Sequence, residues 1–199
     1  MKVLKFGGSS VGTPECILKV KSIVESQVEP SVVVISAFQG VTDQLIKVSK
    51  LAMERDDSYK DMLSGIEQRH YQTVKELFRV NQQSNILAGI KVLINELEET
   101  LHGVFLLQDL PAKTHDTIVS FGERLSSFII SLKINDAYLV EIRDLIKTDS
   151  QYGKAHVLFS QSYPLIAEHF KSLQKYAVVP GFIASNEKGE TTTLGRGGS

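Results

Sequence analysis

Residues 31–38 (SVVVISAF) constrain the fold of this 199-residue chain more than any other feature of the sequence. Their β-branched side chains follow one another almost without a polar break, which is typical of a parallel strand buried on both faces. Residues 1–6 form a shorter apolar stretch. Glycines separate it from a helical pattern that begins at Pro14, with Thr13 as the N-cap. This order of strand, glycine-rich turn, helix and buried strand predicts a βαβ unit and therefore an α/β fold.

The middle of the chain, from Thr42 to about Asn135, contains no convincing strand, and we expect a helical excursion there. The charged residues 54–57 (ERDD) indicate a solvated bend between two of its helices. One apolar stripe has alternating spacings of three and four, and its short length favours packing on neighbouring helices over a coiled-coil partner. The members of this stripe are Leu87, Ile90, Ile94, Leu97 and Leu101.

The sheet is expected to resume after this excursion. Residues 137–142, 155–159 and 176–184 have strand character, and a helix is expected at about residues 163–173. Residues 186–189 (NEKG) have hairpin-turn chemistry, so residues 190–194 are expected to return as a strand. No repeat or linker interrupts the chain, which predicts a single α/β domain with a helical insertion.

Charge and cysteine content narrow the possible partners. The chain carries 22 Lys and Arg against 23 Asp and Glu, so its net charge is −1 and nucleic-acid binding is disfavoured. One cysteine and scattered histidines favour neither a disulfide nor a metal site. No apolar run has the length of a transmembrane helix or a signal peptide. We therefore expect a cytoplasmic protein without a membrane or metal partner.

The first candidate site is the glycine-rich turn after the first strand, with Lys5, Gly7, Gly8 and Ser9. Backbone N–H groups in such a turn can hold phosphate oxygens, and Lys5 would project into the same space. The turn lacks the P-loop lysine, because Thr13 stands in that position, and it is not a dinucleotide-binding fingerprint. A tight turn without chemistry is an equally good interpretation of these residues alone.

Three further candidates follow along the chain. Ser36 and Thr42 flank the loop after the buried strand, where ligands bind in open parallel sheets, although Thr42 by itself is better interpreted as a helix N-cap. Glu123, next to Arg124 in FGERLSS, either lies on a solvent-exposed turn of a helix or points its carboxylate at a ligand amine. Arg196 lies between glycines near the end of the sequence and could bind a carboxylate or phosphate with two hydrogen bonds.

Together these segments resemble aspartate kinases of the amino-acid kinase family. The resemblance rests on KFGGSSV, SAFQGVTD, FGERLSS, PGFIASNEKGE and TTLGRGGS in that order, and it covers residues 1–199. The insertion and the LHGVFLL segment are most similar to the kinase half of bifunctional aspartokinase/homoserine dehydrogenases. The resemblance implies a three-layer αβα, carbamate kinase-like fold with a mainly parallel sheet. It also implies a helical insertion at about residues 56–110 and an incomplete C-terminal side, without the later nucleotide-binding, regulatory and dehydrogenase parts.

The implied reaction transfers the γ-phosphoryl group of ATP to the β-carboxylate of L-aspartate, the first step of lysine, threonine and methionine biosynthesis. On the ATP side, Lys5 would neutralise the phosphoryl group, and the amides of Gly7 and Gly8, with Ser9, would hold phosphate oxygens. Mg²⁺ would arrive with the nucleotide, and NADP would belong only to a fused dehydrogenase half. The family also implies a homo-oligomer, a dimer or larger.

On the aspartate side, the resemblance implies that Arg196 binds the α-carboxylate and Glu123 binds the α-ammonium group. Hydroxyls of Ser36, Thr42 and Ser199 would surround the substrate, with Gly197 in the same loop as Arg196. Two alternatives remain open at this point. One is another family member that acts on glutamate, acetylglutamate or a nucleotide monophosphate, although Glu123 and Arg196 favour a free amino acid. The other is a non-catalytic dimerisation or ligand-binding module on the same fold.

Overall fold

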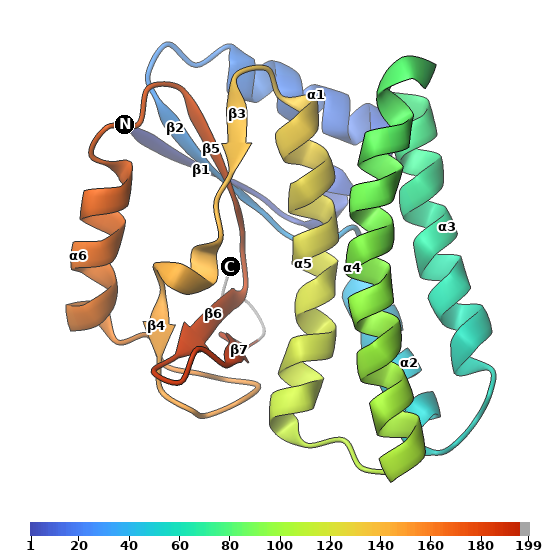
Figure 1. The fold of residues 1–199 in the computed structure, drawn as a ribbon. Coiled ribbons are helices and arrows are strands. Elements are labelled where there is room, and N and C mark those ends of the chain that lie inside the picture. Colours follow the sequence, from blue (N-terminus) through green and yellow to red (C-terminus); the bar gives the residue numbers. More distant parts are fainter. Residues whose placement is uncertain (196–199) are drawn as a thin grey trace.

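A computed structural model describes residues 1–195 of the chain (Figure 1). Its strands are β1 (Lys2–Phe6), β2 (Ser31–Ile35), β3 (Ala137–Leu139), β4 (Lys147–Thr148), β5 (Tyr176–Pro180), β6 (Ile183–Asn186) and β7 (Thr191–Thr193). Its α-helices are α1 (Pro14–Glu25), α2 (Val41–Met53), α3 (Tyr59–Leu77), α4 (Val80–Leu107), α5 (Ala112–Lys133) and α6 (Phe159–Phe170). Two short 3-10 helices, η1 (Gly8–Val11) and η2 (Ile142–Asp144), complete the described elements.

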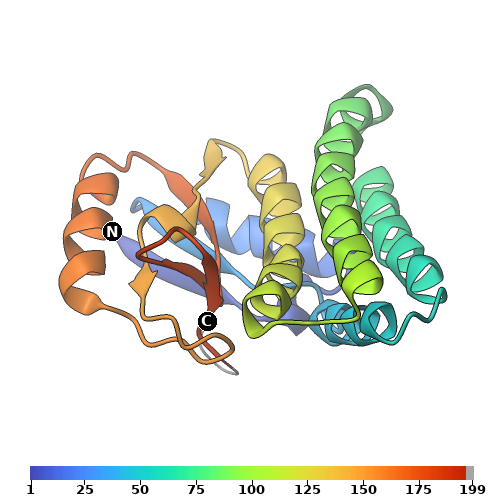
Figure 2. The ribbon, with the colours of Figure 1, turned by 60° about the horizontal axis from the view of Figure 1, so that its bottom comes forward.

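The main sheet contains four parallel strands in the order β1-β2-β5-β3, so the β-branched β2 lies inside the sheet, as its sequence predicts. Successive residues of a strand face opposite sides, and the core divides accordingly. Val33 and Val178 pack with α1 and α5 on one face, whereas Val32 and Val179 pack with Phe170 of α6 on the other. Figure 2 shows this order of α6, sheet and α5, and it confirms the three-layer α/β architecture.

The helical excursion consists of α2, α3 and α4, which pack on α5 at the side away from α6 (Figure 1). The apolar stripe predicted from spacing is confirmed, because Ile90, Ile94, Leu97 and Leu101 are fully buried and Leu87 packs against them. Long helices in this region gain their stability from that packing. Over residues 1–195 we find no helix with both the length and the apolarity required to span a bilayer.

The predicted strand at residues 155–159 is wrong. The structure has only an isolated bridge between Val157 and Thr148 there, and α6 already begins at the end of that segment. The Asp149 carboxylate accepts hydrogen bonds from the backbone amides of Gln151 and His156, at 3.1 and 3.0 Å. Such local side-chain bonds compete with a β-ladder for the same donors. The two-residue strand β4 precedes this loop and has no signal in the sequence.

The predicted strand at residues 176–184 is instead two strands in two sheets. β5 belongs to the main sheet, and β6 joins β4 and β7 in a separate three-stranded sheet. The chain turns at Phe182, whose φ of 65° is incompatible with continuing an extended strand. The hairpin between β6 and β7 is confirmed, since the Asn186 side chain accepts bonds from the amides of Lys188 and Glu190, both at 3.0 Å.

Candidate active site

The candidate site lies at the edge of the main sheet where β1, β2 and β5 end. Two loops leave this edge. The first loop follows β1 and the second loop follows β2, and small residues let the two loops and α5 approach one another closely. A Cβ atom on Gly8 would lie 3.1 Å from the Ala37 carbonyl oxygen, and one on Gly122 would lie 2.8 Å from the Ala37 Cβ. Glycine at these two positions therefore allows the first loop, the second loop and α5 to meet.

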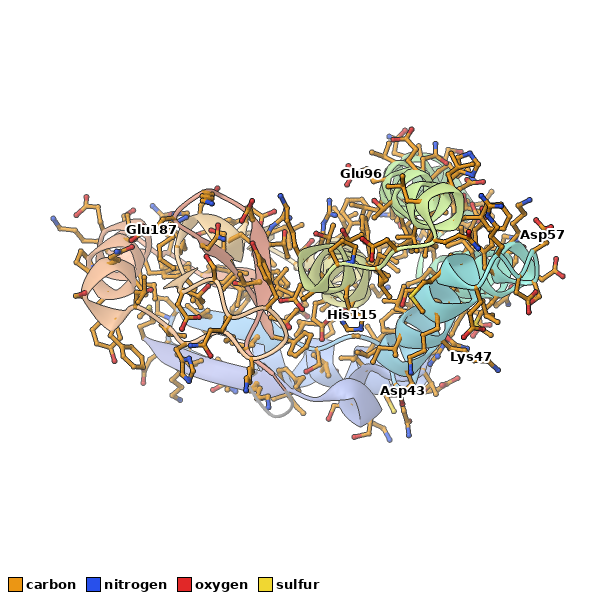
Figure 3. The ribbon with its side chains drawn as sticks, turned by 90° about the horizontal axis from the view of Figure 1, so that it is seen from below. Asp43, Lys47, Asp57, Glu96, His115 and Glu187 are labelled. Carbon is orange, nitrogen blue, oxygen red and sulfur yellow. The ribbon has the colours of Figure 1, made fainter. Side chains whose placement is uncertain are left out.

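A cavity of about 460 Å³ opens beside the second loop. Its walls come from α2, α5, the loop before α6 and the end of β7, and Figure 3 labels His115 of α5 and Asp43 of α2 in a view from below. The volume suits a small ligand such as an amino acid. The residues that line it are Thr42, Asp43, Ile46, His115, Val119, Glu123, Gly153, Phe182, Thr193 and Gly195.

Glu123 is the most unusual of these residues, because its carboxylate is buried and incompletely paired. The residue is 4% exposed, and within residues 1–195 its Oε2 atom has no hydrogen-bond partner. Burial raises the pKa of Glu123 to about 7, although the backbone amide of Ala37 favours the charged form. The sequence interpretation of Glu123 as a surface turn is wrong. A cationic ligand group would satisfy both the charge and the free oxygen.

Thr42 lines the same cavity, so the structure brings two of the predicted substrate residues together. Its interpretation as an N-cap is wrong: Gly40 caps α2 with a φ of 81°, and Thr42 lies inside the first turn. Ser36 lies at the sheet edge but does not line the cavity. Its carbonyl oxygen accepts a hydrogen bond from the Ser126 hydroxyl at 2.9 Å, which joins the second loop to α5.

Lys5 is an exposed residue of β1, one position before the strand ends. Gly7 and Gly8 follow at the same edge and open η1, where the Ser10 amide donates to the Gly7 carbonyl at 2.9 Å. Ser9 is exposed on this turn. These residues lie beside the cavity rather than in its wall. The other three predicted site residues, Arg196, Gly197 and Ser199, lie outside the described residues.

Arg69 is a site-supporting residue that sequence reasoning missed. It belongs to α3, far along the chain, yet it donates to the Gln39 carbonyl at 2.8 Å and to the Gly12 carbonyl at 3.3 Å. One guanidinium therefore joins the two loops of the sheet edge. The neighbouring His70 is fully buried and stacks on Phe38, with 4.9 Å between ring centroids. Helix α3 of the helical excursion thus supports the two loops of the candidate site.

The comparisons with known proteins agree with this geometry. A sequence model of the amino acid kinase family matches residues 1–199. The chain belongs to the amino acid kinase family. The chain is 33% identical to aspartokinase 1 and 30% identical to bifunctional aspartokinase/homoserine dehydrogenase 1, both chloroplastic proteins of Arabidopsis thaliana, over 99% of the chain in each case. It spans 36% and 22% of the lengths of these two relatives, respectively.

Solved structures of the family show the same fold. E. coli aspartokinase III in complex with aspartate and ADP matches with a TM-score of 0.89 at 26% identity, covering 100% of this chain and 44% of that one. Aspartate kinase from Clostridium acetobutylicum matches with a TM-score of 0.79 at 26% identity, covering 100% and 42%. The resemblance to aspartate kinases and the fold that it implied are therefore confirmed.

Asp116 is a second residue of the candidate site that sequence reasoning missed. It lies on α5, seven residues before Glu123, and is fully buried. A spacing of seven places two helical residues on the same face, so the pair Asp116 and Glu123 was a usable signal in the sequence. Among the described residues, no group of three or more His, Cys, Asp and Glu side chains is arranged to hold a metal ion.

Proposed function

We propose that this amino acid kinase phosphorylates L-aspartate, with ATP as the donor and aspartyl phosphate as the product. The observation that carries the proposal is the Glu123 carboxylate, which is buried at the cavity wall with one unpartnered oxygen. An α-ammonium group is a small cation with three donors, and it would supply the missing charge and hydrogen bond. This favours a free amino acid over an acylated one or a nucleotide.

The rest of the substrate fits around this contact. With its ammonium group at Glu123, L-aspartate would lie beside the Thr42 hydroxyl, which lines the same cavity. Arg196 follows Gly195 of the cavity wall directly in the sequence, and its guanidinium suits the α-carboxylate. Ser36, Gly197 and Ser199 remain proposed contacts of the substrate. The β-carboxylate would then point toward the sheet edge where β1 ends.

The transfer requires positioning and charge neutralisation more than covalent help. A β-carboxylate oxygen forms a bond to the γ-phosphorus of ATP, the bond from that phosphorus to the bridging oxygen breaks, and ADP leaves. Lys5 would stabilise the charge on the transferred group, while the amides of Gly7 and Gly8, together with Ser9, would hold phosphate oxygens. Mg²⁺ would enter with ATP and share its phosphate oxygens.

The relatives support the same assignment. The curated relatives named above are aspartokinases or bifunctional aspartokinases, and one solved neighbour was crystallised with aspartate and ADP. Since the chain spans 22% to 44% of these proteins, we assign residues 1–199 to the N-terminal portion of a catalytic domain, with a helical insertion at about residues 56–110. A homo-oligomer is part of the proposal.

Residues 1–199 alone are expected to show weak turnover or none, so the test is a coupled assay of ADP release by the full-length protein that contains them, with ATP, Mg²⁺ and L-aspartate. Calorimetry of L-aspartate binding accompanies the assay. We expect Lys5→Ala to lower turnover by about 100-fold, because a charge on the transferred phosphoryl group loses its partner. Lys2→Ala changes an exposed lysine of the same strand and should leave turnover unchanged. The proposal fails if ADP release does not depend on L-aspartate, or if glutamate or a nucleotide monophosphate is the better acceptor.

A further inference from the structure

Asp116 is a buried charge whose hydrogen-bonding capacity is used by two distant segments. The residue is fully buried in α5. Its Oδ2 atom accepts from the Gly153 amide at 2.9 Å and the Thr193 amide at 2.8 Å, and its Oδ1 atom accepts from the Thr193 hydroxyl at 3.0 Å. Three donors on one carboxylate offset its desolvation. They also hold both segments to the same helix.

The two segments that Asp116 holds form one wall of the candidate cavity. Gly153 and Thr193 both line it, as does Gly195 two residues later. A Cβ atom on Gly195 would lie 3.2 Å from the Gly153 carbonyl oxygen, so these two parts of the wall also touch each other. The wall therefore consists of two chain segments that are joined directly and through a single carboxylate.

Helix α5 places this wall relative to the ligand-facing carboxylate. Asp116 and Glu123 are separated by two helical turns on one face of α5, with Val119 of the cavity between them. The helix is a rigid spacer, so the position of Thr193 and Gly195 relative to Glu123 depends on the bonds to Asp116. The His115 ring lies 3.9 Å from the Asp116 carboxylate and also lines the cavity.

We infer that Asp116 is a positioning residue of the substrate site, which sets the wall formed by Gly153, Thr193 and Gly195 at a fixed distance from Glu123. The inference rests on the proposed function, in which Glu123 binds the ammonium group of L-aspartate. Asp116 does not line the cavity and its carboxylate bonds to the wall, so it acts through the wall and not by contact with substrate. Loss of its bonds would let the wall move and would weaken binding of a ligand that contacts both sides.

Strand β7 supplies a matched pair of variants for the test. Thr193 faces Asp116, whereas its neighbour Thr192 faces the other way and shares a hydrogen bond of 2.7 Å with the Thr148 hydroxyl. Both threonines are buried, so Thr193→Val and Thr192→Val each remove one buried hydroxyl from the same strand. Only the first change affects the bonds to Asp116.

The experiment measures L-aspartate affinity by calorimetry, melting temperature, and hydrogen exchange of the Gly153 and Thr193 amides. We expect Asp116→Asn to weaken L-aspartate binding at least about 10-fold and Thr193→Val about 3-fold, with faster exchange at both amides. Thr192→Val should lower the melting temperature to a similar degree as Thr193→Val while leaving the affinity within about 2-fold. A role in stability alone would instead lower the melting temperature without this difference in affinity.

Two results would overturn the inference. One is an L-aspartate affinity equal to that of the wild type in both Thr193→Val and folded Asp116→Asn. If Asp116→Asn does not fold, the affinity of Thr193→Val decides the test. The other is unchanged exchange of the Gly153 and Thr193 amides in both variants, which would show that Asp116 does not hold the wall. Absence of L-aspartate binding by the wild type would refute the proposed function, and the amide exchange would still decide whether Asp116 holds the wall.

Discussion

Two positions on one face of α5 carry buried carboxylates with opposite hydrogen bonding. At Asp116 three hydrogen-bond donors surround the carboxylate, and they come from two other segments of the chain. At Glu123 one carboxylate oxygen has no donor within residues 1–195. Burial is nearly the same at both positions, so burial alone does not separate a structural charge from a binding charge. The number of donors does, because an unpaired buried charge is costly unless a ligand completes it.

The largest expected effect follows from removing the Glu123 charge. Glu123→Gln should lower L-aspartate affinity by about 100-fold, because a neutral amide lacks the negative charge that strengthens the bond to an ammonium group. The same change should raise the free energy of unfolding without ligand at alkaline pH, whereas Asp116→Asn should lower it. Calorimetry and urea denaturation measure the two quantities. Glu168→Gln, at a side chain that is 81% exposed, is the control and should change neither.

Opposite signs of the two stability changes would support a paired carboxylate at Asp116 and an unpaired one at Glu123. A loss of stability in both Glu123→Gln and Asp116→Asn would contradict this, since Glu123 would then be paired within the folded protein. Unchanged L-aspartate affinity in Glu123→Gln would separately remove the ammonium contact from the proposed function.

Glu123 is expected to make the free energy of unfolding depend on pH, with a change of about 2 kcal/mol. Its pKa is about 7 in the folded state and 4.5 in its unperturbed state, so the folded protein binds more protons between these values. The free energy of unfolding should therefore fall as pH rises from about 5.5 to about 8, relative to Glu123→Gln. Burial lowers the pKa of His70 from 6.5 to about 4, so His70 makes the free energy of unfolding rise with pH below 6.5. This contribution is the same in the wild type and in Glu123→Gln, so it cancels in the difference between them.

Urea denaturation of both proteins across this pH range measures the effect. A difference between wild type and Glu123→Gln that stays constant with pH would show that Glu123 is ionised in the folded protein throughout. Saturating L-aspartate should reduce the slope, because an ammonium partner lowers the pKa of the carboxyl group.

A smaller loss of stability, about 1.5 kcal/mol, is expected from adding a methyl group between α5 and the loop after β2. In Gly122→Ala the new methyl group would lie 2.8 Å from the Ala37 Cβ, so helix and loop must separate and the protein loses stability. Gly65 on α3 has open space around it, and Gly65→Ala should stabilise the protein by about 0.5 kcal/mol instead. Thermal unfolding distinguishes the two signs, and equal shifts would contradict the packing argument.

The smallest effect is expected at Arg124, the residue next to Glu123. Its guanidinium stacks over the Phe121 ring at 4.3 Å and bonds to Glu96 at 2.7 Å, with the Glu96 side chain 47% exposed. Half-exposed pairs of this kind contribute about 0.5 kcal/mol. Arg124→Gln should therefore change stability slightly and L-aspartate affinity not at all. A loss of affinity comparable to that of Glu123→Gln would show that the site extends to this side of α5.

Several parts of the fold could be predicted from local patterns. The buried strand β2, the parallel unit around it and the apolar stripe of α4 all leave a periodicity that burial requires. The loop at residues 155–159 could not be predicted, because the Asp149 side chain competes for amides that otherwise suit a strand. The break at Phe182 was missed for a different reason, since the position with positive φ holds a phenylalanine and not a glycine.

The candidate site likewise contains residues that could be predicted from the sequence and residues that could not. Glu123 and Thr42 were predicted as ligand contacts, and they line one cavity, whereas Ser36 and Lys5 lie beside it at the sheet edge. Asp116 and Arg69 were missed, because their roles depend on partners 77 and 57 residues away along the chain. The spacing of seven between Asp116 and Glu123 indicates a shared helix face, but it does not indicate which distant segments bond to Asp116.

Periodicity and short motifs are local properties of the chain, so they were enough to predict the α/β class, the helical excursion and the resemblance to a kinase family. The tertiary structure decided which carboxylates are buried and how many donors each one meets, because those donors arrive from segments that only folding brings together. On the same face of one helix, Asp116 meets three donors, whereas Oε2 of Glu123 meets none among residues 1–195. That distinction rests on desolvation, which exists only once the surrounding segments have packed.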